Sequence, residues 1–171
     1  WNTIPDGYQT ELTTLSNGKQ VDSRIYPALQ DLFDAMRADG IYPIVREGYR
    51  TTTDQQSILD DKIKAYEQEG LSSLLAKKMA SEWVAAPGTS EHQLGIAVDI
   101  NADKTKSTND EVYTWLAEHA WEYGFILRYP KDKENVTGTG YEPWHYRYVG
   151  KEAAKEIWQE GCCLEEYVTQ N

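Results

Sequence analysis

The stretch LGIAVDI, residues 94–100, alternates large apolar side chains with small ones. A period of two residues is typical of a half-buried β-strand, whose two faces meet different surroundings. The apolar face is expected to pack into a core. The other face carries Gly95 and Ala97 and ends at Asp99, so it leaves room beside a carboxylate for a metal and a substrate.

Helical and strand patterns follow one another on both sides of this strand. Apolar residues at helical spacing predict helices, and short β-branched and aromatic runs predict strands. No linker divides the chain, because the polar stretch 131–140 has the size of an ordinary loop. We therefore expect one α+β domain over residues 1–171, with a mainly antiparallel sheet flanked by helices. The expected helices are 24–40, 58–70, 74–83, 108–123 and 151–160, and the expected strands are 41–49, 94–100, 125–129 and 144–149.

Composition and charge limit the possible partners. The chain has 171 residues, 40% of them hydrophobic, and a net charge of −11. This negative field opposes phosphate backbones and anionic lipid, so we expect no nucleic-acid partner and no membrane contact by the domain itself. The sequence contains no signal segment and no apolar run long enough to span a bilayer. Because it begins at Trp1 without a methionine, we expect a processed piece of a longer protein. We also expect a monomer, and a membrane anchor before Trp1 would fit action at the cell surface.

The two cysteines, Cys162 and Cys163, are neighbours in the sequence. Adjacent cysteines rarely form a disulfide with each other, because disulfide geometry requires Cα atoms further apart than one peptide bond allows. We therefore expect two ordinary thiols near the C-terminus, which do not make a zinc site by themselves.

Two of the three histidines occur in unusual surroundings, His92 in TSEHQLG and His145 in EPWHYRYVG. A catalytic zinc needs three protein ligands and an open position for water. Asp99 follows His92 by seven residues and is the nearest suitable carboxylate. A single histidine at the start of a strand is more often a hydrogen-bonded or surface residue than a ligand, and we interpret His119 in that way. The two segments together predict a metal site.

Glu142 precedes His145 by three residues, with Pro143 and Trp144 between them. Because proline fixes the entry of the chain into the strand, a carboxylate can be presented beside the metal without binding it. Such a carboxylate can take a proton from water on zinc and pass it to a leaving amine. Glu142 is therefore the expected general base and acid.

The two segments resemble known zinc enzymes. SEHQLGIAVD and EPWHYRYVG look like the two zinc elements of the D-Ala-D-Ala carboxypeptidases, and GYRTTTDQQ, GFILRYP and CLEEY extend the resemblance to VanY-type D,D-carboxypeptidases along nearly the whole chain. The wider superfamily of lysostaphin-like and hedgehog-like domains shares the metal scaffold but not the substrate. The resemblance implies the fold of these peptidases and one Zn²⁺ per chain, held by His92, Asp99 and His145.

The resemblance also implies roles for residues around the metal. Glu142 is the general base and acid, and Arg50 in GYRT faces the carbonyl or terminal carboxylate of the substrate, where a guanidinium can stabilise an oxyanion. Ser90 and Gln55 match positions that contact the substrate carboxylate, although capping a turn or a helix is nearly as good an explanation for each. Glu47 departs from the family, which commonly has serine there. We expect Glu47 to point away from Arg50 and to lie off the substrate pocket.

The resemblance implies a zinc-dependent D,D-carboxypeptidase that removes the terminal D-Ala from peptidoglycan pentapeptide stems. The resemblance implies a role in glycopeptide (vancomycin) resistance or in cell-wall remodelling, and an extracytoplasmic site of action. An L,D-carboxypeptidase acting on tetrapeptides and a D-Ala-D-Ala dipeptidase remain as alternatives with the same chemistry. A catalytically silent zinc-binding module is the alternative from another class, and the presence of Glu142 and Arg50 argues against it.

Overall fold

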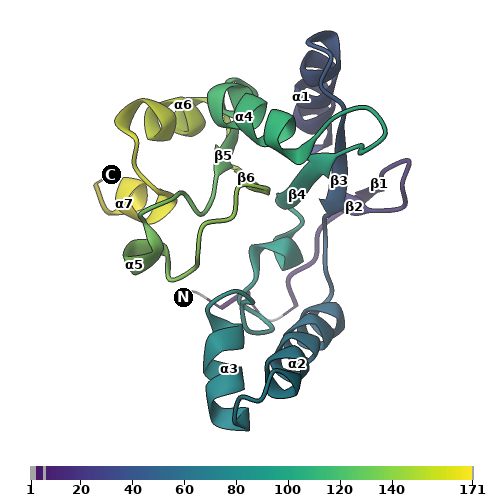
Figure 1. The fold of residues 1–171 in the computed structure, drawn as a ribbon. Coiled ribbons are helices and arrows are strands. Elements are labelled where there is room, and N and C mark those ends of the chain that lie inside the picture. Colours follow the sequence, from purple (N-terminus) through teal and green to yellow (C-terminus); the bar gives the residue numbers. More distant parts are fainter. Residues whose placement is uncertain (1–2, 6, 171) are drawn as a thin grey trace.

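The computed structural model describes residues 3–5 and 7–170, and a four-stranded antiparallel sheet is its centre (Figure 1). The strand order is β3-β4-β6-β5, so β4 and β6 are the inner strands. The combination of this sheet with surrounding helices confirms the expected α+β class. The strands are β3 (Pro43–Glu47), β4 (Ala97–Ala102), β5 (Phe125–Leu127) and β6 (His145–Tyr148).

Helices surround the sheet on several sides (Figure 1). The helices α2 and α3 form a pair at the end of the molecule opposite α1 and α4, and α7 lies against α5. Within the described ranges, no helix has both the length and the apolar character needed to cross a bilayer. The helices are α1 (Tyr26–Ala38), α2 (Thr52–Gln68), α3 (Ser73–Ser81), α4 (Asn109–His119), α5 (Glu134–Thr137), α6 (Lys151–Glu160) and α7 (Leu164–Gln170), with 3₁₀ turns η1 (Glu91–Leu94) and η2 (Ala120–Tyr123).

Most of the expected elements are present, with shifted ends. The helix predicted over 151–160 is α6, and Thr108 caps α4 through a reciprocal bond with Glu111. Helix α2 begins at Thr52, six residues before the expected start, because Thr51 and Asp54 form a capping box. Helices α5 and α7 and the hairpin of β1 (Leu12–Thr14) and β2 (Gln20–Asp22) were not expected from the sequence patterns.

The core lies between one face of the sheet and helices α1 and α4. Val98 and Ile100 of β4 are fully buried there together with Leu32 and Met36 of α1. Burying side chains of this size stabilises the fold by roughly 1.5–3 kcal/mol each. The apolar face of β4 therefore packs as expected, and it leaves the face that bears Asp99 free for other contacts.

The strand expected over 94–100 begins later than predicted. Leu94 ends the turn η1, and Gly95 follows it with a φ of +74°, so the strand β4 starts at Ala97. The carbonyl of Gly95 accepts a hydrogen bond from the backbone N–H of Asp22 at 2.9 Å. A Cβ at Gly95 would lie only 3.0 Å from that same nitrogen. Glycine is therefore required here both for the backbone conformation and for the close approach of β2.

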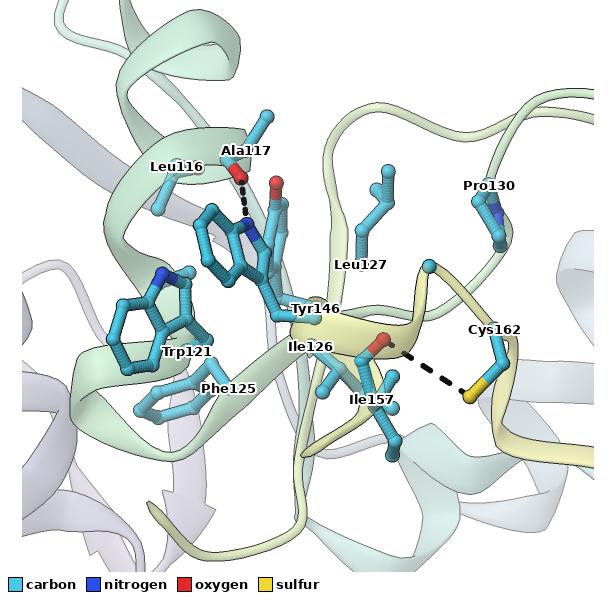
Figure 2. Close-up of a pocket in the computed structure, with 13 residues that line it drawn as sticks. Leu116, Ala117, Trp121, Phe125, Ile126, Leu127, Pro130, Tyr146, Ile157 and Cys162 are labelled. Atoms are coloured by element: carbon cyan, nitrogen blue, oxygen red, sulfur yellow. Dashed lines mark hydrogen bonds between the residues drawn. The ribbon is translucent and has the colours of Figure 1, made fainter. Parts of the chain in front are cut away.

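A cavity of about 170 Å³ is lined by side chains from α4, η2, β5, β6 and α6 (Figure 2). Trp121 and Trp158 stack beside it with ring centroids 4.9 Å apart, and Trp158 donates a hydrogen bond to the carbonyl of Ala117 at 3.1 Å. Tyr146 of β6 contributes to the lining, and its buried hydroxyl has no hydrogen-bond partner among the described residues. Cys162 also lines the cavity, and both Cys162 and Cys163 are free thiols, as expected.

We predict that Gly95→Ala destabilises the protein more than Gly18→Ala does. Both glycines have positive φ, which costs an alanine about 1–2 kcal/mol. Of the two, only Gly95 has backbone atoms close to the position that the new Cβ would take, and such overpacking typically adds about 1–3 kcal/mol to the loss of stability. Urea unfolding of the two variants, with chelator present, measures the difference. An equal loss of unfolding free energy in the two variants would show that the close approach of β2 adds nothing to the cost of a Cβ at position 95.

Candidate metal site and catalytic pocket

Three side chains expected as metal ligands converge on one point. Their donor atoms, one each from His92, Asp99 and His145, all lie within 4.8 Å of one another. Asp99 Oδ1 is 3.3 Å from His92 Nε2 and 3.4 Å from His145 Nδ1. Asp99 and His145 are paired directly across β4 and β6, while His92 comes from the turn η1.

The orientation of His92 is fixed by its other ring nitrogen. Nδ1 lies 2.9 Å from the carbonyl oxygen of Gly48, which can only accept, so Nδ1 carries the proton. In the form that binds metal, Nε2 is then the free donor, and it faces Asp99. The backbone N–H of Arg50 donates to the carbonyl of His92 at 3.2 Å, which ties the segment after β3 to η1.

His145 is oriented in the opposite sense. Its Nε2 lies 2.9 Å from Oε1 of Glu91, and an ionised carboxylate accepts, so Nε2 carries the proton in the form that binds metal. The other nitrogen, Nδ1, faces Asp99 and lies 3.2 Å from Oε2 of Glu142. Each histidine thus uses one nitrogen to hold its ring and presents the other to the common point.

The donor set fits zinc. Ligands at about 2.0–2.1 Å in a tetrahedral zinc site are about 3.3–3.4 Å apart, which is the spacing of Asp99 Oδ1 from both histidine nitrogens. Asp99 Oδ1 is buried and has no hydrogen-bond partner among the described residues. Such an atom is costly without a positive partner. Two histidines, one carboxylate and an adjoining pocket are typical of a catalytic zinc centre with an open position.

The charges around this point favour ionised carboxylates. Burial by itself would raise the pKa of Asp99, but its proximity to His92, His145 and Arg50 holds that pKa below its usual value. Burial disfavours the charged imidazolium of His145, yet the carboxylates of Glu142, Glu91 and Asp99 raise its pKa to about 10. The point between these groups is therefore strongly attractive to a cation.

A pocket of about 160 Å³ opens onto the three donors. Glu142, 8% exposed, lines it and lies beside the donor nitrogen of His145, where a carboxylate can exchange protons with water. Two tryptophans and two carboxylates contribute to the wall. The lining residues are Arg50, Gln55, Ile58, Trp83, Val84, Ala85, Ser90, His92, Asp99, Tyr129, Thr139, Glu142, Trp144 and His145.

Arg50 reaches this pocket from the segment that follows β3. Its Nη2 is 3.6 Å from Oδ2 of Asp99, and its Nη1 donates to Oε1 of Gln55 at 3.3 Å. Its Nε is buried without a hydrogen-bond partner among the described residues. The guanidinium therefore keeps donors available beside the metal position.

The two expected carboxylate contacts, Gln55 and Ser90, both line the pocket and are buried. Gln55 uses its amide nitrogen to donate to the carbonyl of Ala85 at 2.8 Å and its oxygen to accept from Arg50. This pattern indicates that Gln55 also holds Arg50 in place. Ser90 precedes η1 without capping it through its side chain.

The expectation that Glu47 points away from Arg50 was wrong. Oε2 of Glu47 lies 3.8 Å from Nε of Arg50, and its Oε1 accepts from Lys19 at 2.8 Å. Strand alternation does not extend to Arg50, because β3 ends at Glu47 and the register shifts between Val45 and Glu47. Glu47 does not line the pocket, as expected, and its contact with the site is the one with Arg50.

His119, which we interpreted as a packing or surface residue, is not among the residues that line the pocket. It ends α4 with its ring 4.8 Å from that of Trp115, and its Nδ1 is 2.9 Å from Oε1 of Glu122.

The sequence analysis did not identify Glu91 as a neighbour of His145. The two residues are 54 positions apart in the chain, so no local sequence pattern connects them.

The profile of the VanY family, described as D-alanyl-D-alanine carboxypeptidase, matches residues 18–151. The chain belongs to the VanY family. A D-alanyl-D-alanine carboxypeptidase of Enterococcus faecalis is 60% identical over 98% of this chain. The chain spans 62% of the length of that VanY relative, which is less than two thirds.

Solved structures of VanY-like proteins have the same fold. VanYB in complex with D-alanine-D-alanine is 60% identical, with a TM-score of 0.97 over 98% of this chain and 93% of that chain. A point mutant of the vancomycin resistance D,D-pentapeptidase VanY in complex with Zn(II) gives a TM-score of 0.96 at 60% identity, over 98% of this chain and 94% of that one. The LdcB LD-carboxypeptidase is 37% identical, with a TM-score of 0.75 over 97% and 76% of the two chains.

The donor geometry predicts opposite tautomers for the two site histidines after zinc is added. His92 should keep its proton on Nδ1 and bind through Nε2, whereas His145 should keep its proton on Nε2 and bind through Nδ1. Two-bond ¹H–¹⁵N spectra of histidine-labelled protein distinguish the two forms. His119, which lies outside the site, is the internal control. The same tautomer at both ligands would contradict the described orientations.

Proposed function

We propose that this chain is a zinc-dependent D,D-carboxypeptidase domain that releases the terminal D-Ala from peptidoglycan pentapeptide stems. The observation that carries the proposal is the convergence of the donors of His92, Asp99 and His145, with Glu142 and Arg50 at the same pocket. The VanYB complex with D-alanine-D-alanine and the zinc complex of VanY support both the metal and the substrate class.

Each residue has a part in the proposed hydrolysis. Zinc held by the two histidines and Asp99 would supply a Lewis acid and lower the pKa of water. Glu142, beside the donor nitrogen of His145, takes a proton from the attacking water and later gives it to the amine of the departing D-alanine. Arg50 donates to the oxygen of the scissile carbonyl or to the terminal carboxylate of the substrate.

The pocket also bears on the alternatives. A dipeptidase needs an acidic anchor for a free amine, but the carboxylates among the described lining residues are Asp99 and Glu142, which both face the metal position. This favours a carboxypeptidase over a dipeptidase. The likeness to the LdcB LD-carboxypeptidase keeps tetrapeptide hydrolysis as the second candidate. A silent zinc-binding module would need neither Glu142 nor Arg50.

The proposed substrate places the site of action outside the cytoplasmic membrane, where peptidoglycan lies. Trimming of stems that end in D-Ala-D-Ala would contribute to vancomycin resistance or to wall remodelling. We propose that the domain acts as a monomer, and its net charge of −11 fits the absence of a nucleic-acid partner.

The deciding experiment measures D-alanine release from a muramyl pentapeptide and a tetrapeptide side by side. We expect release from the pentapeptide, loss of activity with chelator, and recovery with zinc. Glu142→Gln should lower kcat by about 10²–10⁴-fold while zinc still binds. Glu118→Gln on α4, whose side chain is 67% exposed, is the matched control. Activity unchanged by chelation would exclude the zinc mechanism, and release from the tetrapeptide alone would favour the L,D alternative.

We predict that Arg50→Lys lowers kcat/KM by about 10²–10³-fold, because an ammonium cannot reproduce the forked donors of the guanidinium. Arg46→Lys, on the exposed face of the preceding strand, should leave kcat/KM unchanged. Steady-state kinetics on the pentapeptide compare the two variants. If both retained parental activity, Arg50 would have no part in binding or catalysis.

A further inference from the structure

Glu91 is a buried carboxylate behind the metal site. It belongs to η1, immediately before His92, and is 8% exposed. It is not among the residues that line the catalytic pocket. Glu91 therefore lies next to two of the proposed zinc ligands, one along the chain and one in space, outside the pocket onto which their donors open.

Three donors surround this carboxylate, two from β6 and one from the segment that follows β5. Oε1 lies 2.9 Å from Nε2 of His145, and Oε2 accepts from Nε of Arg128 at 3.0 Å and from Nη1 of Arg147 at 2.9 Å. Burial opposes ionisation, but these three partners hold the pKa of Glu91 well below its usual range. The carboxylate is thus fixed at both oxygens, and one of them is devoted to His145.

The hydrogen bonds around Glu91 continue, through Arg128, to the C-terminal helix α7. Arg128 donates through Nη1 and Nη2 to both carboxylate oxygens of Glu165 in α7, at 3.0 and 2.7 Å. A guanidinium held by two carboxylates in this way has little freedom to move. Helix α7 lies outside residues 18–151, which match the family profile. A segment beyond the matched region therefore contacts Arg128, which contacts Glu91, which in turn contacts His145.

We propose that Glu91 is a positioning residue that fixes His145 with Nδ1 toward the metal. The inference rests on the proposed zinc site. A carboxylate on the distal nitrogen of a ligating histidine fixes the tautomer, orients the ring and increases its basicity. His92 has a neutral carbonyl in the corresponding place, so the charged partner is specific to His145.

A purely structural role for Glu91 makes a different prediction. In that case Glu91 would serve only to neutralise Arg128 and Arg147, and any loss of this charge would lower stability without a specific effect on the metal. Glu165 offers a matched control, because it neutralises the same Arg128 but does not contact His145. Removal of either charge leaves a buried guanidinium with one carboxylate fewer.

The test measures the zinc affinity of metal-stripped protein by competition with a chromophoric chelator. We expect Glu91→Gln to weaken zinc binding about 10- to 100-fold, and Glu165→Gln to change it by less than about threefold. The visible absorption of the cobalt-substituted protein should shift in Glu91→Gln and stay parental in Glu165→Gln. Thermal unfolding of the metal-free forms reports the stability change separately.

A second variant covers the possibility that Glu91→Gln does not fold. Glu91→Asp keeps the charge that faces both arginines but shortens the side chain by one methylene, so it should fold and still weaken zinc binding. Parental zinc affinity in the folded Glu91 variants, or an equal loss in Glu165→Gln, would overturn the inference. If the parent itself bound no zinc, the proposed function would fail first, so the two failures are distinguishable.

Discussion

The pairing of Asp99 with His145 across β4 and β6 is the constraint on which the rest of the site depends. Both residues lie on inner strands, and the same register places Val98 and Ile100 in the core. A slip of one residue would exchange the two faces of β4, exposing its apolar side chains and burying Asp99 in the core. Hydrophobic burial, which is worth far more than any single polar contact, therefore fixes the position of the metal donors.

The site also gathers charges of opposite sign at low exposure. Asp99, Glu142 and Glu91 surround His145, and all of these side chains are at most 13% exposed. Such groups are costly to bury singly, since desolvation can exceed the attraction within a pair. Here each carboxylate has a cationic partner or faces the proposed metal position. This cluster of buried charges is therefore better explained by its place around the proposed metal position than by a contribution to stability alone.

Both zinc elements could be found in the sequence because their spacing is local. His92 and Asp99 are seven residues apart, and Glu142 and His145 are three apart, so each half forms a short motif. Glu47 shows where such reasoning fails. Strand alternation predicted that it would face away from Arg50, but an irregular register at the end of β3 brings the two side chains to 3.8 Å. Bulges depend on the partner strand, which the local pattern does not contain.

By itself, the sequence predicted the fold class and the buried face of β4 from periodicity, and it singled out the three proposed metal ligands and Glu142 from motif spacing, because both signals are properties of neighbouring residues. Only the tertiary structure decided which nitrogen each histidine presents, how Gln55 holds Arg50, and that Glu91 supports His145. These contacts join residues 5 to 54 positions apart, which belong to η1, α2, β6 and the segment between β3 and α2. A one-dimensional pattern carries no information on such orientations.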